Sequence, residues 1–184
     1  MRKRLLLATL ATMSIFVGMV VEAAAYNPWW HANLWVHQHT RTFPVFRADL
    51  GLNYWAQVSA QAERDWDTNT ILALPYTDQH AGSRIHVQAG DYGNTGWLGL
   101  SDAATGWDGT SGHYSQNHVY LNYYYEDTVI TGKAVACHEI GHALGRGHGG
   151  DGCMQTPQTY VNALAGPGAH DIAETNSMYP ARGH

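Results

Sequence analysis

The chain has 184 residues, a formal net charge of −5 at pH 7 and only 14% charged residues. This acidic balance argues against a nucleic-acid partner, because nucleic-acid-binding surfaces are basic. A chain of this length is sufficient for one domain that buries roughly two thirds of its unfolded surface, so one domain is expected.

The N-terminus has the pattern of an export signal. Basic residues at 2–4 precede an apolar run at 5–21 and three alanines at 23–25. A membrane anchor is the alternative, because the apolar run is borderline in length for spanning a bilayer. The small residues after it favour cleavage. We therefore predict a signal peptide at 1–25 and a secreted domain at 26–184, with no membrane contact after cleavage.

The first half of the secreted part predicts a helix between two strands. Residues 34–46 alternate between apolar and polar side chains, as a strand does. Asp49 can cap a helix over 50–66, where apolar residues recur at helical spacing. A short strand follows at 71–74 and is expected to stop at Pro75.

Three further strands are predicted in the middle of the chain. The alternating stretch RIHVQ at 84–88 predicts a strand that ends in the glycine- and asparagine-rich turn at 89–96. Residues 97–100 predict another, followed by a loop at 102–112. The stretch HVYLNYYYE at 118–126 is the most convincing strand, because it is rich in β-branched and aromatic residues.

Two helices complete the predicted order. Thr131 can cap a helix over 132–144, and the last helix is expected at 170–179. The order strand, helix, strands, helix, helix indicates a mixed α+β domain.

The first of these helices carries a cluster of histidines in the stretch ACHEIGHALGRGHGGDGCMQ, residues 136–155. His138 and His142 are four apart and project from one helix face, so their imidazoles can hold one Zn²⁺. Glu139 lies about 100° round the helix from His138. It can reach a water held by the metal without being a ligand, as general base and then general acid.

The end of the helix can bring in a third ligand. Gly145 is expected to take the left-handed conformation that reverses the chain, so that His148 returns to the metal. Three histidines leave the fourth position of a tetrahedral ion open, which is typical of catalytic zinc. Chance is the alternative explanation, but the residue frequencies of this chain give the five-residue pattern at roughly one in ten thousand.

Both cysteines lie in the same stretch. In an exported chain Cys137 and Cys153 are most simply interpreted as one disulfide. The alternative, that they bind zinc, is weaker because Cys137 directly precedes His138, and neighbouring helical residues point about 100° apart.

The pattern H-E-x-x-H-x-x-G-x-x-H, formed by His138, Glu139, His142, Gly145 and His148, resembles the signature of the metzincin metalloproteases. The preceding GKAVACHEIGHALG is similar to the matrixin active-site helix, and DIAETNSMY at 171–179 resembles the closing helix of matrixins. The resemblance implies a zincin-like α+β fold. Its twisted, mostly parallel five-stranded sheet would have an antiparallel edge strand, two helices behind it and a third below the zinc.

The resemblance also implies an apolar methionine floor beneath the zinc. Met154 is the favoured residue and Met178 the alternative, because Met178 lies within the predicted last helix. The chain departs from its relatives in places. Arg146 stands where matrixin-like proteins usually carry an apolar residue, and His148 stands where the small secreted snapalysins use aspartate.

The implied activity is that of a secreted zinc endopeptidase with one catalytic Zn²⁺ and a protein or peptide substrate. The peptide would pair with the strand at 97–101, and residues 156–168 would wall a side-chain pocket, with Tyr160 the favoured lining residue. A monomer is expected. Nothing in the sequence supports a structural Ca²⁺.

A second metal site among other histidines is an alternative to a role in the strands. His86, His113 and His118, with Asp91 and Asp108, do not match the spacing of the structural sites of matrixins, so we interpret these histidines as solvated or strand-facing.

The sequence leaves two alternative functions. One is a catalytically silent metzincin-like domain that binds protein or glycan through aromatic residues, but an intact Glu139 argues against it. The other is a structural zinc protein, but the sequence offers no strong fourth ligand.

Overall fold

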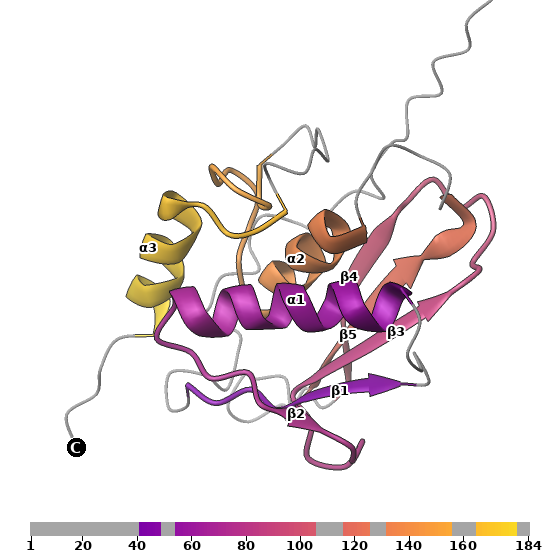
Figure 1. Cartoon of the computed structure of the whole chain (residues 1–184), viewed down its shortest axis with the longest axis horizontal. Coiled ribbons are helices and arrows are strands. Elements are labelled where there is room, and N and C mark those ends of the chain that lie inside the picture. Colours follow the sequence, from indigo (N-terminus) through magenta and orange to yellow (C-terminus); the bar gives the residue numbers. More distant parts are fainter. Residues whose placement is uncertain (1–40, 49–53, 106–115, 126–131, 156–164, 180–184) are drawn as a thin grey trace, which may run out of the picture.

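The computed structural model describes residues 41–48, 54–105, 116–125, 132–155 and 165–179 (Figure 1). The predicted signal peptide, the predicted caps Asp49 and Thr131, and Tyr160 lie outside the described residues. The elements in chain order are β1 (Val45–Ala48), α1 (Tyr54–Asn69), β2 (Tyr76–Thr77), β3 (Ile85–Gly90), β4 (Gly99–Thr105), β5 (Gln116–Asn122), the 3₁₀ helix η3 (Tyr123–Tyr125), α2 (Gly132–Ala143) and α3 (Ala169–Met178).

The strands form one five-stranded sheet in the order β2-β1-β3-β5-β4. The pairs β1–β2, β1–β3 and β3–β5 are parallel, whereas β4 is antiparallel to β5 and lies at the edge. This confirms the predicted fold class, a mixed α+β domain with a mostly parallel sheet, an antiparallel edge strand and three helices.

One face of the sheet packs against the helices and forms the core. Val87 on β3 and Val119 on β5 are fully buried in one cluster with Trp66 of α1 and Ile140 of α2. Burying side chains of this kind contributes roughly 1.5–3 kcal/mol each. The indole Nε1 of Trp66 also donates to the Cys137 carbonyl at 3.0 Å. In Figure 1 α1 runs alongside α2, and α3 lies beyond one end of α1.

The first two strands differ from the prediction. β1 begins only at Val45, because Pro44 has no N–H to donate to a ladder. Residues 71–74, all of which the structure describes, do not form the predicted strand. They contribute a single isolated bridge, between Thr42 and Ala73. The expectation that Pro75 ends the pairing was wrong, because its carbonyl accepts the Val45 N–H at 2.9 Å and β2 follows it.

The other strands are shifted by a few residues. β3 continues to Gly90, within the predicted turn, and β4 runs to Thr105, within the predicted loop, with a register shift after Asp102. β5 ends at Asn122, not at residue 126. The Asn122 side chain donates to the Gly93 carbonyl at 3.0 Å, and the chain then turns into η3.

The helices lie close to their predicted positions. α1 ends at Asn69, three residues beyond the predicted end, and the Thr70 hydroxyl donates to the Trp66 carbonyl at 2.6 Å just after it. α2 and α3 end within one residue of prediction, which is within the usual uncertainty of helix boundaries.

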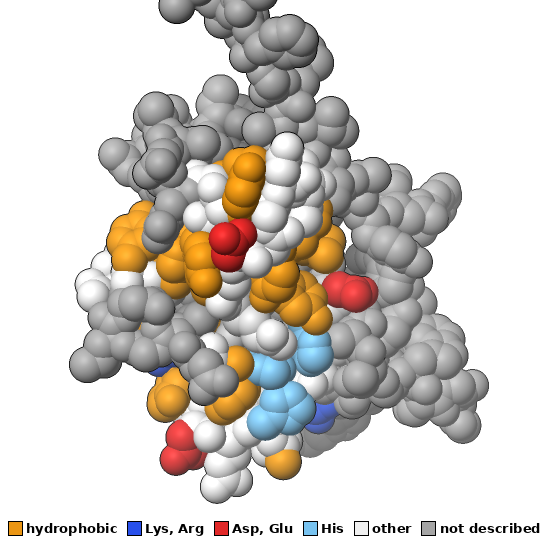
Figure 2. Space-filling view, turned by 90° about the vertical axis from the view of Figure 1, so that its right-hand side faces the viewer, with side chains coloured by type: hydrophobic (Ala, Val, Ile, Leu, Met, Phe, Trp, Pro, Cys, Tyr) orange, Lys and Arg blue, Asp and Glu red, His pale blue; other side chains and the backbone are white. Residues whose placement is uncertain are grey.

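The face drawn in Figure 2 shows a patch of histidine side chains bordered by hydrophobic ones, with few charged side chains near it. Within the described ranges, no helix has both the length and the apolar character needed to cross a bilayer.

Candidate metal centre

Three histidines converge at the C-terminal end of α2. His138 and His142 lie one helical turn apart, and Gly145 adopts a φ of 85°, which reverses the chain just after the helix. The Arg146 N–H donates back to the Gly141 carbonyl at 2.9 Å and closes this turn. His148 is thereby returned to the helix. The three Nε2 atoms lie 2.9 Å (138–142), 3.1 Å (142–148) and 3.2 Å (138–148) apart.

Backbone carbonyls fix the tautomers of the two helical histidines. The Nδ1 of His138 donates to the Cys153 carbonyl, and the Nδ1 of His142 to the Arg146 carbonyl, both at 2.7 Å. A carbonyl can only accept, so each Nδ1 carries the proton and each neutral ring presents an Nε2 lone pair. Two such lone pairs at 2.9 Å repel each other unless a cation lies beside them. The donor set therefore fits a metal ion held on the Nε2 side.

The spacing of these donors fits zinc. Two imidazole nitrogens on one tetrahedral Zn²⁺ with bonds of about 2.05 Å lie about 3.3 Å apart, and the three Nε2 distances are slightly shorter. All three histidines also form one of the clusters whose ligand atoms lie within 4.8 Å of one another. The geometry is thus compatible with a three-histidine zinc site.

Burial favours the neutral form of the two helical histidines. Desolvation holds the pKa of His138 well below its ordinary value and lowers the pKa of His142 to about 4. Neutral imidazole is the form that binds metals. His138 is 2% exposed, His142 is half-buried and His148 is exposed, so the centre opens to solvent on the side of His148.

Glu139 lies against the edge strand. Its side chain is buried, and a Cβ at Gly99 of β4 would lie 2.5 Å from the Glu139 Cγ and 2.8 Å from its Oε1. Only glycine at position 99 leaves room for this carboxylate. The edge strand and the carboxylate therefore adjoin, a contact that the sequence analysis missed because Gly99 lies 40 residues before Glu139.

The predicted disulfide between Cys137 and Cys153 is present, with Cα atoms 5.9 Å apart. It joins the residue before His138 to the residue whose carbonyl accepts from the His138 ring. The short connection after His148 is therefore fastened to α2 at the first ligand, both covalently and through a hydrogen bond.

The two candidate methionines occupy different places. Met154 is fully buried and packs directly against α2 at Gly141. A Cβ added at Gly141 would lie 2.3 Å from the Met154 Sδ. Met178 is partly buried at the end of α3 and packs against the core. Of the two, Met154 thus packs directly against the helix that carries His138 and His142.

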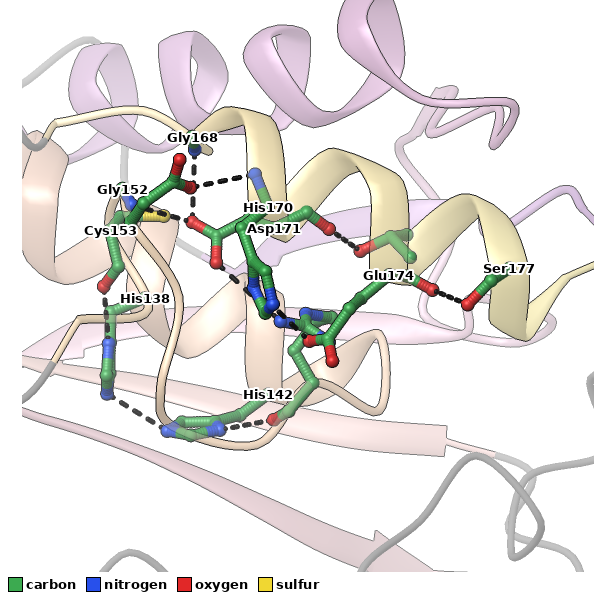
Figure 3. Close-up of polar contacts among 12 residues, drawn as sticks. His138, His142, Gly152, Cys153, Gly168, His170, Asp171, Glu174 and Ser177 are labelled. Carbon is green, nitrogen blue, oxygen red and sulfur yellow. Dashed lines mark hydrogen bonds and ion pairs between the residues drawn. The ribbon is translucent and has the colours of Figure 1, made fainter.

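An ion pair behind the third ligand was also missed. The Arg146 guanidinium is buried, contacts Glu174 and lies 3.6 Å from Asp171 Oδ1. The other Asp171 oxygen accepts the Gly152 N–H at 3.1 Å and the Gly168 N–H at 3.0 Å (Figure 3). Two features of the sequence could have indicated this ion pair: Arg146 stands at a position expected to be apolar, and Asp171 begins the segment of the last helix. The sequence does not show that the two residues meet, because only the fold brings them together.

The remaining predicted residues have mixed outcomes. Asp91 belongs to a turn, where its carboxylate accepts the Gly93 N–H at 2.9 Å. His113 and Asp108 lie outside the described residues. His86 is strand-facing as expected but buried rather than solvated, and it meets His118 and an unexpected partner, His80.

The comparisons with known proteins address the fold. Neither the protein-family models nor the curated proteins give a match to this sequence. The structure is similar to the solved structure of myroilysin, with a TM-score of 0.51 and 13% sequence identity, over 82% of this chain and 97% of that chain. The fold is therefore similar to that of myroilysin, and α2 with the turn that follows it presents three histidines that can hold a metal ion.

Proposed function

We propose that this chain is a secreted zinc-dependent endopeptidase. The observation that carries the proposal is the convergence of the Nε2 atoms of His138, His142 and His148 at the end of the helix that also bears the buried Glu139. The similarity of fold to myroilysin, a metalloprotease, supports a protease-like function. The disulfide supports export, since disulfides persist in oxidising compartments.

The histidines and Glu139 have separate proposed roles in peptide hydrolysis. His138, His142 and His148 would hold Zn²⁺, which when bound polarises the scissile carbonyl and lowers the pKa of water. Glu139 accepts a proton from the attacking water as the new C–O bond forms. It returns that proton to the amide nitrogen as the C–N bond breaks, so the products are a carboxylic acid and an amine, and transfer of the acid's proton to the amine then gives a carboxylate and an ammonium group.

The substrate would bind as an extended peptide along β4. β4 ends the strand order of the described sheet and lies beside Glu139 at Gly99. A peptide that adds itself to such an edge places successive backbone carbonyls past the site. Residues 156–168 and Tyr160 are proposed to wall the pocket for the side chain after the scissile bond.

The supporting residues have proposed roles as well. Met154 is the floor under the ligands, because it packs against Gly141 between His138 and His142 on α2. The domain at 26–184 is proposed to act as a monomer after removal of 1–25.

The test is proteolysis of denatured casein by wild type, Glu139→Gln and the control Asp78→Asn, which removes an exposed carboxylate in the loop after β2. Loss of general base catalysis should lower kcat by about 10²–10⁴-fold in Glu139→Gln only. A chelator should abolish wild-type activity, and added Zn²⁺ should restore it. Stoichiometric zinc in a wild type that is as inert as Glu139→Gln on casein and on a peptide library would refute the protease assignment and favour a binding domain.

A further inference from the structure

A second group of histidines lies on the face of the sheet opposite the helices. His86 on β3 and His118 on β5 are direct neighbours in the parallel register, next to the buried pair Val87 and Val119. Because successive strand residues point to opposite faces, these histidines point away from the core that the valines join. His80, from the loop between β2 and β3, completes the group, and the ligand atoms of all three lie within 4.8 Å of one another.

His86 is the unusual member of this group. It is only 6% exposed, and among the described residues neither of its ring nitrogens has a hydrogen-bond partner. Its ring is enclosed by Phe46, His80 and His118, with centroids at 4.9, 4.6 and 4.8 Å. Leaving a buried polar group unsatisfied costs about 1–3 kcal/mol. The His86 ring therefore requires a polar partner. Because its neighbours His80 and His118 are also imidazoles, a partner that all three rings can bind at once would satisfy it.

A hydrogen-bond chain sets the tautomer of His118. The Gln116 amide Nε2 donates to the Ser83 carbonyl at 3.3 Å and to its hydroxyl oxygen at 2.8 Å, so Gln116 Oε1 is the atom facing His118. That oxygen accepts from His118 Nε2 at 3.1 Å, which leaves the lone pair on Nδ1, where the Tyr120 hydroxyl lies at 3.1 Å. His118 Nδ1 thus accepts from the Tyr120 hydroxyl, and its lone pair becomes free for a metal ion when that hydroxyl rotates away.

The same chain holds the loop that carries His80. The Ser83 hydroxyl donates to the His80 carbonyl at 2.8 Å, and the Ser83 N–H donates to it at 3.2 Å. The His80 side chain itself is exposed and can move. Burial, the largest cause, lowers the pKa of His86 to about 4 and also lowers the pKa of His118, so both rings are neutral at pH 7. Asp102, opposite His118 on β4, adds a negative charge nearby.

We propose that His80, His86 and His118 form a second metal site, which takes a divalent transition metal such as Zn²⁺ and fastens the β2–β3 loop to the outer face of the sheet. An all-imidazole donor set favours Zn²⁺, Ni²⁺, Co²⁺ or Cu²⁺ over Ca²⁺ and Mg²⁺. The donors must close from within 4.8 Å to the roughly 3.3 Å that one tetrahedral zinc ion requires. The exposed His80 supplies that movement. The site does not depend on the proposed peptidase activity.

The test is the number of metal ions that the purified chain retains after loading with Zn²⁺ and gel filtration, with Co²⁺ absorption as a second readout. The variants are His80→Ala, which changes an exposed side chain, and His86→Phe, which keeps an aromatic ring beside Phe46. His170→Ala, an exposed histidine of α3 outside both clusters, is the control. His142→Gln removes a ligand of the centre on α2.

Wild type and His170→Ala should retain two ions per chain, and His80→Ala and His86→Phe one. His142→Gln should also retain one, and its combination with His80→Ala none. A wild type with a single ion that disappears in His142→Gln would overturn the second site while leaving the peptidase proposal intact. Two ions in both His80→Ala and His86→Phe would overturn it as well. Activity lost in Glu139→Gln with two ions retained would show that the two proposals are separable.

Discussion

The two histidine clusters have similar ring spacing and different surroundings. Ring centroids lie 4.4–5.0 Å apart in the cluster on α2, and in the other cluster they lie 4.6 Å (His80–His86) and 4.8 Å (His86–His118) apart. In the first cluster His138 and His142 are each oriented by a different backbone carbonyl, and the Nε2 atoms already converge. In the second, His86 has no hydrogen-bond partner in the part of the chain that the structure describes, and His118 is hydrogen-bonded to neighbouring side chains.

This difference shows what preorganisation contributes to a metal site. Supporting hydrogen bonds on metal-ligating histidines are worth roughly 10–100-fold in affinity or activity. The cluster on α2 has two such bonds to the backbone, which cannot rotate away. The sheet cluster must move His80 and release a hydroxyl before it can close. We therefore expect the centre on α2 to bind Zn²⁺ more tightly than the sheet site.

The largest expected effect comes from removing one ligand from each cluster. His142→Gln should abolish casein hydrolysis and lower Zn²⁺ affinity at α2 by more than the roughly 10–100-fold that a lost supporting hydrogen bond costs. His80→Ala should leave kcat within about twofold, because the sheet site takes no part in the proposed chemistry. Kinetics and zinc titration check both. Equal loss of activity in the two variants would contradict the division of roles.

The disulfide should matter to one cluster only. Replacing Cys137 and Cys153 together with alanine should lower the free energy of unfolding by about 3 kcal/mol, since the bridge closes a loop of 16 residues in sequence separation. The Cys153 carbonyl would then hold the His138 ring less firmly, and zinc affinity at α2 should fall. Denaturant unfolding and zinc titration measure the two effects. Unchanged stability would contradict the prediction, and zinc binding to the sheet cluster should not change.

Gly99→Ala should separate catalysis from metal binding. Its Cβ would meet Glu139 at 2.5 Å and displace the carboxylate, and misplacement by about 1 Å can cost 10²-fold in rate. Gly147→Ala is the matched control, because its Cβ would meet nothing within 4 Å. We expect kcat to fall by about 10²-fold in Gly99→Ala alone, with both zinc ions retained. An unaffected rate would show that Glu139 is not held by β4.

The smallest expected effect is on pH dependence in the metal-free protein. Unfolded histidines take up protons near pH 6.5, whereas folded His86 and His142 do so near pH 4. Between these values the unfolded state binds more protons, so both residues make stability fall as pH falls. Glu63 acts in the opposite direction, because burial raises its pKa to about 7.

Variants can isolate these contributions. His86→Phe and His142→Gln should each flatten the loss of stability between pH 6.5 and 4, measured by denaturant unfolding in the presence of a chelator. The control Gln79→Ala, which changes an exposed side chain without a titratable group, should leave it unchanged. A slope that is identical in wild type and His86→Phe would show that His86 is already protonated in the folded chain near pH 6.

The local part of the cluster on α2 could be predicted from sequence. The spacing of His138 and His142 is a property of the helix, and the reversal that returns His148 needs only the glycine at 145. The disulfide was also predictable, because the chain has two cysteines and they lie near each other. Strand ends were less predictable. The pairing of Val45 with the Pro75 carbonyl and the turn made by the Asn122 side chain depend on partners far away in the sequence.

The sequence by itself determined the α+β class, the helix that carries His138 and His142 and the link between Cys137 and Cys153, because these follow from helical periodicity and short spacings. Only the tertiary structure decided that Gly99 faces Glu139, that Arg146 meets Asp171, and that His80 joins His86 and His118. The alternation of RIHVQ and NHVYL tells which residues share a face within each strand. It does not set the register between strands, because that depends on how the whole sheet packs against α1 and α2.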